Sequence, residues 1–529
     1  MDKNIKKINA RTITLTIIFV LILVVIALLI GKFSYSYLAP TVSDDVEGSG
    51  EVTATGDTII FTKGNTLSLS ATTDNFKTNG DNLTSTTNPK VKLMASSKTN
   101  SASSKYFAGI IIKNNTYTYT TTDKKPEVIL TVKDENGNIV ETSADNLNFV
   151  TVNDNLKGFD ITGVNGAFNI VTDHIIATSS NKSEVIHTWT FILTFVNLGT
   201  DQSNNENSTL NIDVVLQKDK IPTTIADFCA NGDNLNDCVV SSYNGLGIAL
   251  NLYYHDSILT NGAEDNSYRY AGANPNNYVC FGSDEATCPT ENLYRIIGLI
   301  DGKIKLISAD GATTDMLGTD GGYGATYGGL GYDTSYYKGN GDLSKIGLYS
   351  WNSAGTNMWS TSTTNLTNLN TNYLTYLDGK NSKWKTMIDD TMWYVGGMTY
   401  NNGVKSNAKT AYSVEAGERS DKIANVTSKI GLMYVSDYYY GANSEYWILQ
   451  GNNYKEANNY NWINLGLLEW TITPNFEVSS QAFEVFFPGS VDIGGVEEPG
   501  IIRPTFNLIS SIKYVSGSGT SENPIRISL

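Results

Sequence analysis

The residue types that most often carry out chemistry are few in this chain. It has three histidines, His174, His187 and His255, and all four of its cysteines lie between positions 229 and 288. Ser-His-Asp catalysis requires a histidine base beside the nucleophile, and metal centres commonly use several histidines or closely spaced cysteines. We therefore predict no catalytic residues, no metal site and no cofactor, and we favour a protein that is not an enzyme.

The four cysteines are the clearest covalent signal. They are Cys229, Cys238, Cys280 and Cys288. An even number of cysteines close together in an exported chain favours disulfides, and we predict the local pairs Cys229–Cys238 and Cys280–Cys288. A zinc site is the alternative, but the eight and seven intervening residues differ from the usual spacing of two to four.

Aromatic residues gather in the C-terminal part of the chain, interleaved with small polar residues. Tyrosine and tryptophan offer a large, stiff contact surface with a polar tip, which is typical of recognition sites. Three consecutive tyrosines cannot all point inward on one strand or helix, so we expect at least one to be exposed; the alternative for each tryptophan is a place in the core. The predicted ligand-binding residues are Tyr438, Tyr439, Tyr440, Trp447 and Trp462, together with Asp437 and Glu469.

Two of these residues suggest a second kind of chemistry. Glu469 precedes Trp470, and an apolar neighbour can turn a carboxyl group into a general acid. Paired with Asp437, it could hydrolyse a glycosidic bond, as pairs of carboxylates do in glycosidases. The alternative is that Glu469 forms an ion pair with Arg503 in the core.

An uncharged, strongly apolar segment spans residues 12–31. A helix of about 20 residues is about 30 Å long, which matches the hydrocarbon core of a bilayer. Basic residues precede the segment and acidic residues follow it, so the positive-inside rule places the N-terminus in the cytoplasm. We predict a cytoplasmic tail (1–11), a transmembrane helix (12–31), a linker (32–50) and an extracellular remainder of a single-pass protein at the cell membrane. The alternative is a cleaved signal peptide.

The charge balance limits the partners. The formal net charge is −16 at pH 7. A strongly acidic surface repels the phosphates of nucleic acids, so we exclude nucleic acid as a partner. We expect the membrane, through the anchor, and an extracellular glycan or protein ligand as partners.

Residues 51–220 show the alternation of apolar and polar residues that is typical of strands with one buried face. The pattern is clearest over Thr188 to Val196 and over Leu210 to Leu216. A hairpin is predicted over Val128 to Thr142, because Asn136-Gly137 supplies the positive φ angles of a tight turn. We predict a β-sandwich of immunoglobulin-like type, acting as a spacer.

Residues 221–529 mix short strands with a few helices, which predicts an α+β fold. Asn292 to Ser308 contains two apolar runs around Asp301-Gly302 and predicts a hairpin. Asn365 to Asp378 is the best helix, with Leu366, Leu369, Tyr373 and Leu377 on one stripe. Further strands are expected at Ile430–Val435, Leu467–Thr473, Phe483–Phe487 and Ile501–Leu508. Residues 310–342 are expected to form long loops without a calcium-binding motif.

This C-terminal part resembles exported bacterial modules of the formylglycine-generating (sulfatase-modifying) and C-type-lectin-like fold, over residues 221–529. The resemblance implies a C-type-lectin-like α+β domain. The N-terminal part is only generically similar to membrane-anchored surface proteins with immunoglobulin-like domains. The segments that carry the resemblance are Tyr268-Arg269-Tyr270, Asn274 to Phe281, Tyr294 to Gly298, Gly431 to Tyr438, Glu469-Trp470-Thr471 and Arg503 to Leu508.

The departures from this family remove its best-known activities. No cysteine follows Cys288, whereas the formylglycine-generating enzymes use a late cysteine pair, and no histidine follows His255 for an iron site. The Glu-Pro-Asn and Gln-Pro-Asp triplets of calcium-dependent lectins are also missing. We therefore expect a membrane-anchored extracellular surface protein that displays an adhesin-like binding domain on a β-sandwich spacer. The alternatives are an exported, glycan-directed hydrolase that uses carboxylates, and a purely structural envelope protein.

Overall fold

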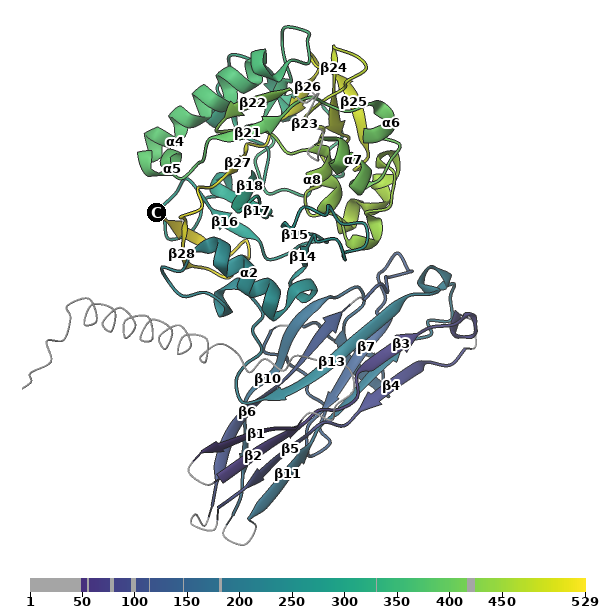
Figure 1. Ribbon diagram of the computed structural model, residues 1–529. Helices are drawn as coiled ribbons and strands as arrows, with labels where there is room; N and C mark the ends of the chain where they lie inside the picture. Colours follow the sequence, from purple (N-terminus) through teal and green to yellow (C-terminus); the bar gives the residue numbers. More distant parts are fainter. Residues whose placement is uncertain are drawn as a thin grey trace, which may run out of the picture. The chain divides into compact units, whose positions relative to one another are not determined.

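The computed structural model describes residues 49–529 except 55–56, 77–79, 97–100, 114, 146, 180–182, 330 and 416–423. The two largest hydrophobic cores of the described chain are separate in sequence (Figure 1). One is formed by side chains between Ile59 and Leu216, and the other by side chains between Ile225 and Ile527. We call the corresponding parts the β region (49–217) and the C-terminal region (225–529).

The β region consists of antiparallel strands in three sheets, which enclose one core as in a β-sandwich. The strand orders are β1-β2-β5-β11, β10-β6-β13-β3 and β4-β12-β7-β9-β8. Its strands are β1 (Ser49–Ala54), β2 (Asp57–Thr62), β3 (Leu67–Ser70), β4 (Leu83–Thr87), β5 (Lys90–Met94), β6 (Ser103–Lys113), β7 (Val128–Lys133), β8 (Phe149–Asn153), β9 (Leu156–Asp160), β10 (Gly166–Ala177), β11 (Glu184–Thr188), β12 (Thr190–Phe195) and β13 (Thr209–Gln217).

The alternation seen in the sequence corresponds to the buried face of these strands. Phe191, Leu193 and Phe195 of β12 are fully buried, as is Trp189 just before it. On β13, the alternate apolar residues from Leu210 to Leu216 are buried in the same core. Burial of one such side chain contributes about 1.5–3 kcal/mol to stability. The predicted strands with one buried face are confirmed.

The predicted hairpin over Val128 to Thr142 is only partly formed. The chain reverses at Gly137, whose φ of 83° suits a tight turn. The returning segment makes one isolated bridge, between Lys133 and Ile139, and no strand. β7 instead pairs with β12 and β9, and its residues from Val128 to Val132 are all buried.

The C-terminal region has helices around two six-strand sheets, one antiparallel and one mixed through the parallel pair β23 and β26 (Figure 1). The sheet orders are β14-β15-β17-β18-β27, with β16 also paired to β17, and β19-β20-β26-β23-β24-β25. The α-helices are α2 (Leu235–Gly245), α3 (Thr314–Leu317), α4 (Leu374–Lys380), α5 (Ser382–Thr386), α6 (Tyr400–Gly403), α7 (Ala408–Glu415) and α8 (Val435–Tyr440). The strands are β14 (Leu252–Tyr254), β15 (Tyr268–Tyr270), β16 (Tyr278–Cys280), β17 (Leu293–Ile300), β18 (Lys303–Ser308), β19 (Tyr323–Thr326), β20 (Gly347–Ser350), β21 (Thr391–Tyr394), β22 (Asn425–Ser428), β23 (Glu469–Pro474), β24 (Gln481–Val485), β25 (Val491–Gly495), β26 (Pro499–Ile501), β27 (Thr505–Asn507), β28 (Lys513–Ser516) and β29 (Arg526–Ser528).

The hairpin predicted around Asp301-Gly302 is formed by β17 and β18. Both turn residues have positive φ, 49° at Asp301 and 71° at Gly302. Two successive positive φ angles characterise the tight turn whose twist matches that of antiparallel strands. The apolar residues of both strands are buried in the core of the C-terminal region.

The predicted helix over Asn365 to Asp378 exists, but its first part is wider than an α-helix. Residues Thr364–Tyr373 form a π-helix (η8), which continues into α4. Leu369, Tyr373 and Leu377 are buried, whereas Leu366 is exposed. The π-helical spacing rotates the first turn relative to the α-helical stripe, so Leu366 leaves the apolar face.

Two segments differ from the expectation of a strand or a long loop. Ile430–Val435 is not a strand, because only Gly431 forms a bridge, to Thr505, and Val435 already begins α8. Within 310–342, the chain forms α3, β19 and a short 3₁₀ turn.

The predicted anchor requires a correction. Residues 12–31 lie outside the described residues. Between residues 49 and 529, no described helix is both long enough and apolar enough to cross a bilayer. This finding contradicts the transmembrane helix in the predicted fold class and the predicted localisation at the cell membrane, and the membrane as a partner stays a prediction. The β-rich remainder is compatible with the predicted sandwich.

Both predicted disulfides are confirmed. Cys229 pairs with Cys238, and Cys280 pairs with Cys288. The first joins the segment before α2 to its first turn, and the second closes the loop between β16 and β17. Their presence fits an extracellular, oxidising environment.

Candidate functional site

The three consecutive tyrosines all lie in α8 and are buried, with at most 1% of each side chain exposed. The expectation that at least one is exposed is wrong, because α8 is a short helix covered by the core on every side. Their positions exclude direct contact with a ligand in this conformation. Each hydroxyl donates to a backbone carbonyl: Tyr438 to Gly489, Tyr439 to Gly403 and Tyr440 to Asn261.

Trp447 also belongs to the core. Its side chain is fully buried, and its indole N–H donates to the carbonyl of Ala442 at 2.9 Å. The ring packs edge-on against Tyr253 and Tyr440. It therefore stabilises the packing around α8 and does not line a surface.

Asp437 is engaged in a buried ionic network. One carboxylate oxygen lies 3.3 Å from a guanidinium nitrogen of Arg269, and the other lies 2.5 Å from the Lys305 ammonium. The backbone N–H of Tyr434 donates to the same carboxylate at 2.9 Å, which caps the start of α8. Because these contacts occupy its lone pairs, Asp437 stabilises the fold.

Glu469 is also occupied by a buried ion pair. Arg503 donates to both carboxylate oxygens, from Nε at 2.7 Å and from Nη2 at 2.8 Å. Both side chains are 2% exposed. The alternative prediction, a core ion pair between Glu469 and Arg503, is confirmed. The pair Asp437 and Glu469 is thus not available for acid–base hydrolysis.

Trp462 is the one predicted residue that lines a cavity. The cavity has a volume of about 360 Å³ and lies beside β16 and β17. The indole N–H donates to the carbonyl of Tyr270 at 2.8 Å, which fixes the ring at the cavity wall. The other lining residues used below are Asn274, Tyr278, Arg295, Asp310 and Lys338.

The strand pairing places a cation between two aromatic rings in this cavity. Arg295 on β17 lies directly opposite Tyr278 on β16. The guanidinium carbon is 4.2 Å from the centre of the Tyr278 ring and 4.5 Å from that of Trp462. This stacking suits a planar guanidinium and fixes its orientation.

Arg295 is buried and forms no ion pair with a carboxylate of any described residue. Only 6% of the residue is exposed. Nε donates to Asn277 at 2.7 Å, and Nη2 donates to Pro275 at 2.9 Å and to Asn274 at 3.2 Å, so all three acceptors are neutral. Nη1 makes no hydrogen bond to any residue that the structure describes. Desolvation lowers the pKa of Arg295 to about 10, which still leaves it charged at neutral pH.

A second cation stands at the rim of the same cavity. Lys338 donates to the carbonyl of Asn458 and forms no ion pair with the described residues. Partial desolvation lowers the pKa of Lys338 to about 8, although the residue remains exposed. The carboxylate of Asp310 also lines the cavity, but it accepts hydrogen bonds from Tyr337, Gly311 and Gly341.

This arrangement is suited to binding an anion. A buried guanidinium with one free edge is a strong donor to a carboxylate or phosphate. The cavity is of the size of a small-ligand site. Its second cation and its asparagine amides add further donors and acceptors.

The sequence interpretation did not single out Arg295 or Lys338 as binding residues. Arg295 and Tyr278 occur within two segments that carry the family resemblance, Tyr294 to Gly298 and Asn274 to Phe281. Their spacing gives no indication that β16 and β17 place the two side chains opposite each other. Lys338 comes from a loop distant in sequence.

Comparisons with protein-family models, with curated proteins and with solved structures found no match to this chain. The resemblance to the formylglycine-generating and C-type-lectin-like fold therefore stays a prediction.

Proposed function

We propose that the protein is an extracellular binding protein whose C-terminal region holds the carboxylate of an acidic sugar, such as a uronic acid unit of a glycan. The observation that carries the proposal is Arg295, a buried cation that lines the cavity and has no carboxylate partner among the residues that the structure describes. A carboxylate placed at Nη1 would supply the missing negative charge.

The rest of the cavity supports a sugar as the carrier of that carboxylate. Asn340 and Asn459 line the cavity, and their side chains form no hydrogen bond with described residues. Amide groups bind sugar hydroxyls as donors and as acceptors. A volume of about 360 Å³ suits one or two sugar rings.

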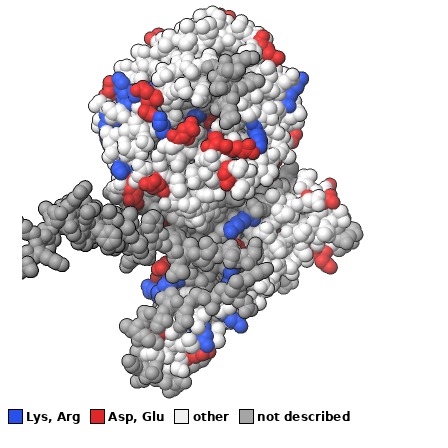
Figure 2. Space-filling view, viewed as in Figure 1, with Lys and Arg blue, Asp and Glu red and all other residues white. Residues whose placement is uncertain are grey.

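On the face shown in Figure 2, uncharged residues dominate, and the acidic and basic side chains are interspersed. The β region serves as the support for the binding region, and the two disulfides suit an extracellular location.

Calorimetric titration of the full chain with glucuronate and with glucose tests the proposal. The two sugars differ in the carboxylate, and a hydrogen bond to a charged group contributes about 1.5–3 kcal/mol. We expect glucuronate to bind about 10- to 100-fold more tightly than glucose. Equal affinities, no binding of either sugar, or binding of acetyl-Gly-Gly in place of glucuronate would overturn the proposal.

A pair of lysine variants links this binding to the cavity. Lys338→Ala removes the cation at the rim, whereas Lys380→Ala removes an exposed cation at the end of α4, outside the cavity lining. We expect weaker glucuronate binding only for Lys338→Ala. An equal loss in both variants would show that binding follows net charge and not the cavity.

A further inference from the structure

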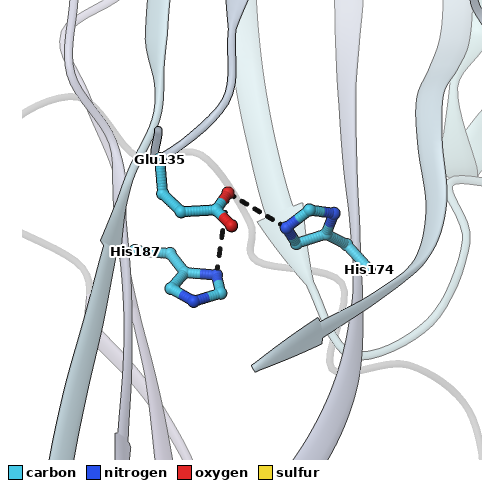
Figure 3. Close-up of side chains that lie close together, drawn as sticks. All are labelled: Glu135, His174 and His187. Atoms are coloured by element: carbon cyan, nitrogen blue, oxygen red, sulfur yellow. Dashed lines mark hydrogen bonds and ion pairs between the residues drawn. The ribbon is translucent and has the colours of Figure 1, made fainter. Parts of the chain in front are cut away.

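Two of the three histidines meet in the β region, although they are 13 residues apart in sequence. His174 Nε2 lies 3.0 Å from Glu135 Oε2, and His187 Nδ1 lies 3.9 Å from the same oxygen. Figure 3 shows both ring nitrogens directed at the carboxylate. All three ligand atoms lie within 4.8 Å of one another.

The two histidines come from different sheets, and the glutamate comes from a turn. Glu135 lies in the turn after β7, His174 on β10 and His187 on β11. The register of β10 against β6 shifts between Val171 and His174, and Asp173 within this irregularity has a φ of 54°. Such bulges redirect a side chain, and this one accompanies the turn of His174 toward Glu135.

The Tyr106 hydroxyl lies between the indole of Trp189 and the ring of His187. The indole N–H of Trp189 donates to the Tyr106 hydroxyl at 2.8 Å. The Tyr106 hydroxyl also lies 2.9 Å from His187 Nδ1, and either atom can be the donor of this hydrogen bond. Nδ1 can bind a metal ion when it is unprotonated and gives up its contact with Tyr106.

His187 Nδ1 and Glu135 Oε2 are 3.9 Å apart, which is too far for a direct hydrogen bond. Ligand pairs around a tetrahedral zinc ion with bonds of about 2.0–2.1 Å are about 3.4 Å apart. The separations of 3.0 and 3.9 Å lie on either side of this value. The three side chains are 12–24% exposed, so an ion can reach them.

We propose that Glu135, His174 and His187 bind one divalent transition-metal ion of the zinc type. Two imidazole nitrogens and one carboxylate form a donor set that such ions favour. Three protein ligands leave a coordination position for water or for an external ligand. The site lies outside the cavity of the C-terminal region, so the proposal is independent of the proposed function.

Titration of the full, metal-free chain with Zn²⁺ tests the site, and histidine ring signals in NMR spectra report where the ion binds. We expect one equivalent to bind, with shifts of the His174 and His187 signals and none of His255, which lies in the other core. Binding without these shifts, or no saturable binding, would overturn the proposal.

Two variants with small structural changes sharpen the test. Glu135→Gln keeps the side-chain size but removes the charged ligand, and we expect at least a tenfold loss of Zn²⁺ affinity. Tyr106→Phe removes the hydroxyl that competes with the metal for His187 Nδ1, and we expect equal or tighter binding. Melting curves in EDTA check that both variants fold. Unchanged affinity in a folded Glu135→Gln variant would show that this carboxylate is only a hydrogen-bond partner and would overturn the site.

Discussion

The surroundings of α8 and the cavity beside β17 both contain buried cations, but the cations in the two places have different kinds of partner. Around α8, Arg269 and Lys305 both form ion pairs with the carboxylate of Asp437. Arg503 forms an ion pair with Glu469 and donates to both of its carboxylate oxygens. In the cavity, Arg295 has only neutral acceptors and two aromatic rings. The difference indicates that the first group of charges stabilises the fold, while the last charge is available to a ligand.

The largest effect is expected where a paired charge loses its partner. Glu469→Gln leaves the Arg503 guanidinium buried without its carboxylate. Removing one member of a buried ion pair costs about 3–5 kcal/mol of stability. Denaturant unfolding measures this loss. A stability change below 1 kcal/mol would contradict the assignment of this pair to the fold.

A buried carboxyl group without a cation provides the opposite case. Burial, Asp492 and Glu498 raise the pKa of Glu484 to about 7, above the usual 4.5, and no described residue donates a hydrogen bond to it. The folded state therefore holds the proton more tightly, so its contribution to stability is complete below pH 4.5 and is lost as the pH rises to 7. We expect Glu484→Gln to be more stable than the native protein by about 3 kcal/mol at pH 8 and equally stable at pH 4. Thermal or denaturant unfolding at both pH values checks this, and equal stabilities at pH 8 would contradict it.

Replacing Arg295 should affect ligand binding more than stability, whereas breaking the pair of Glu469 and Arg503 should affect mainly stability. Arg295→Met removes a buried charge that has no carboxylate partner, so the stability should change by less than about 1 kcal/mol. Glucuronate binding should weaken about 10- to 100-fold, since the charged hydrogen bond is lost. Measuring unfolding and binding on the same variant separates the two effects. Loss of stability with unchanged binding would place Arg295 with the structural charges.

The smallest effect is expected at the rim. Because the pKa of Lys338 is about 8, its charge is lost as the pH rises from 7 to 9. Glucuronate binding should then weaken about two- to fivefold, as an exposed ion pair contributes at most about 1 kcal/mol. Titrations at pH 7 and pH 9 measure this change, and Lys338→Ala should abolish it. The same pH dependence in Lys338→Ala would assign it to another group.

Local patterns in the sequence predicted much of the fold. The alternation around Phe191 and Leu193, the turn at Asp301-Gly302 and the two disulfides depend on residues that are close in the chain. The exposure of the tyrosines in α8 could not be predicted in the same way, because long-range packing decides whether a short helix is covered.

Long-range placement also explains what the sequence did not reveal about sites. Arg295 meets Trp462 only after the C-terminal region has folded, and Glu135, in the turn after β7, meets the two histidines only after β10 and β11 have taken their places in two different sheets. No local period or motif spans these separations. The scarcity of histidine argued against a metal site, yet two of the three histidines lie beside one carboxylate.

The most direct test of the central claim is a crystal structure of the full chain with bound glucuronate. We expect the sugar carboxylate in the cavity, within hydrogen-bond distance of Arg295 Nη1 and beside Trp462. A cavity that stays free of sugar at saturating concentration, or a sugar bound with its carboxylate away from Arg295, would contradict it.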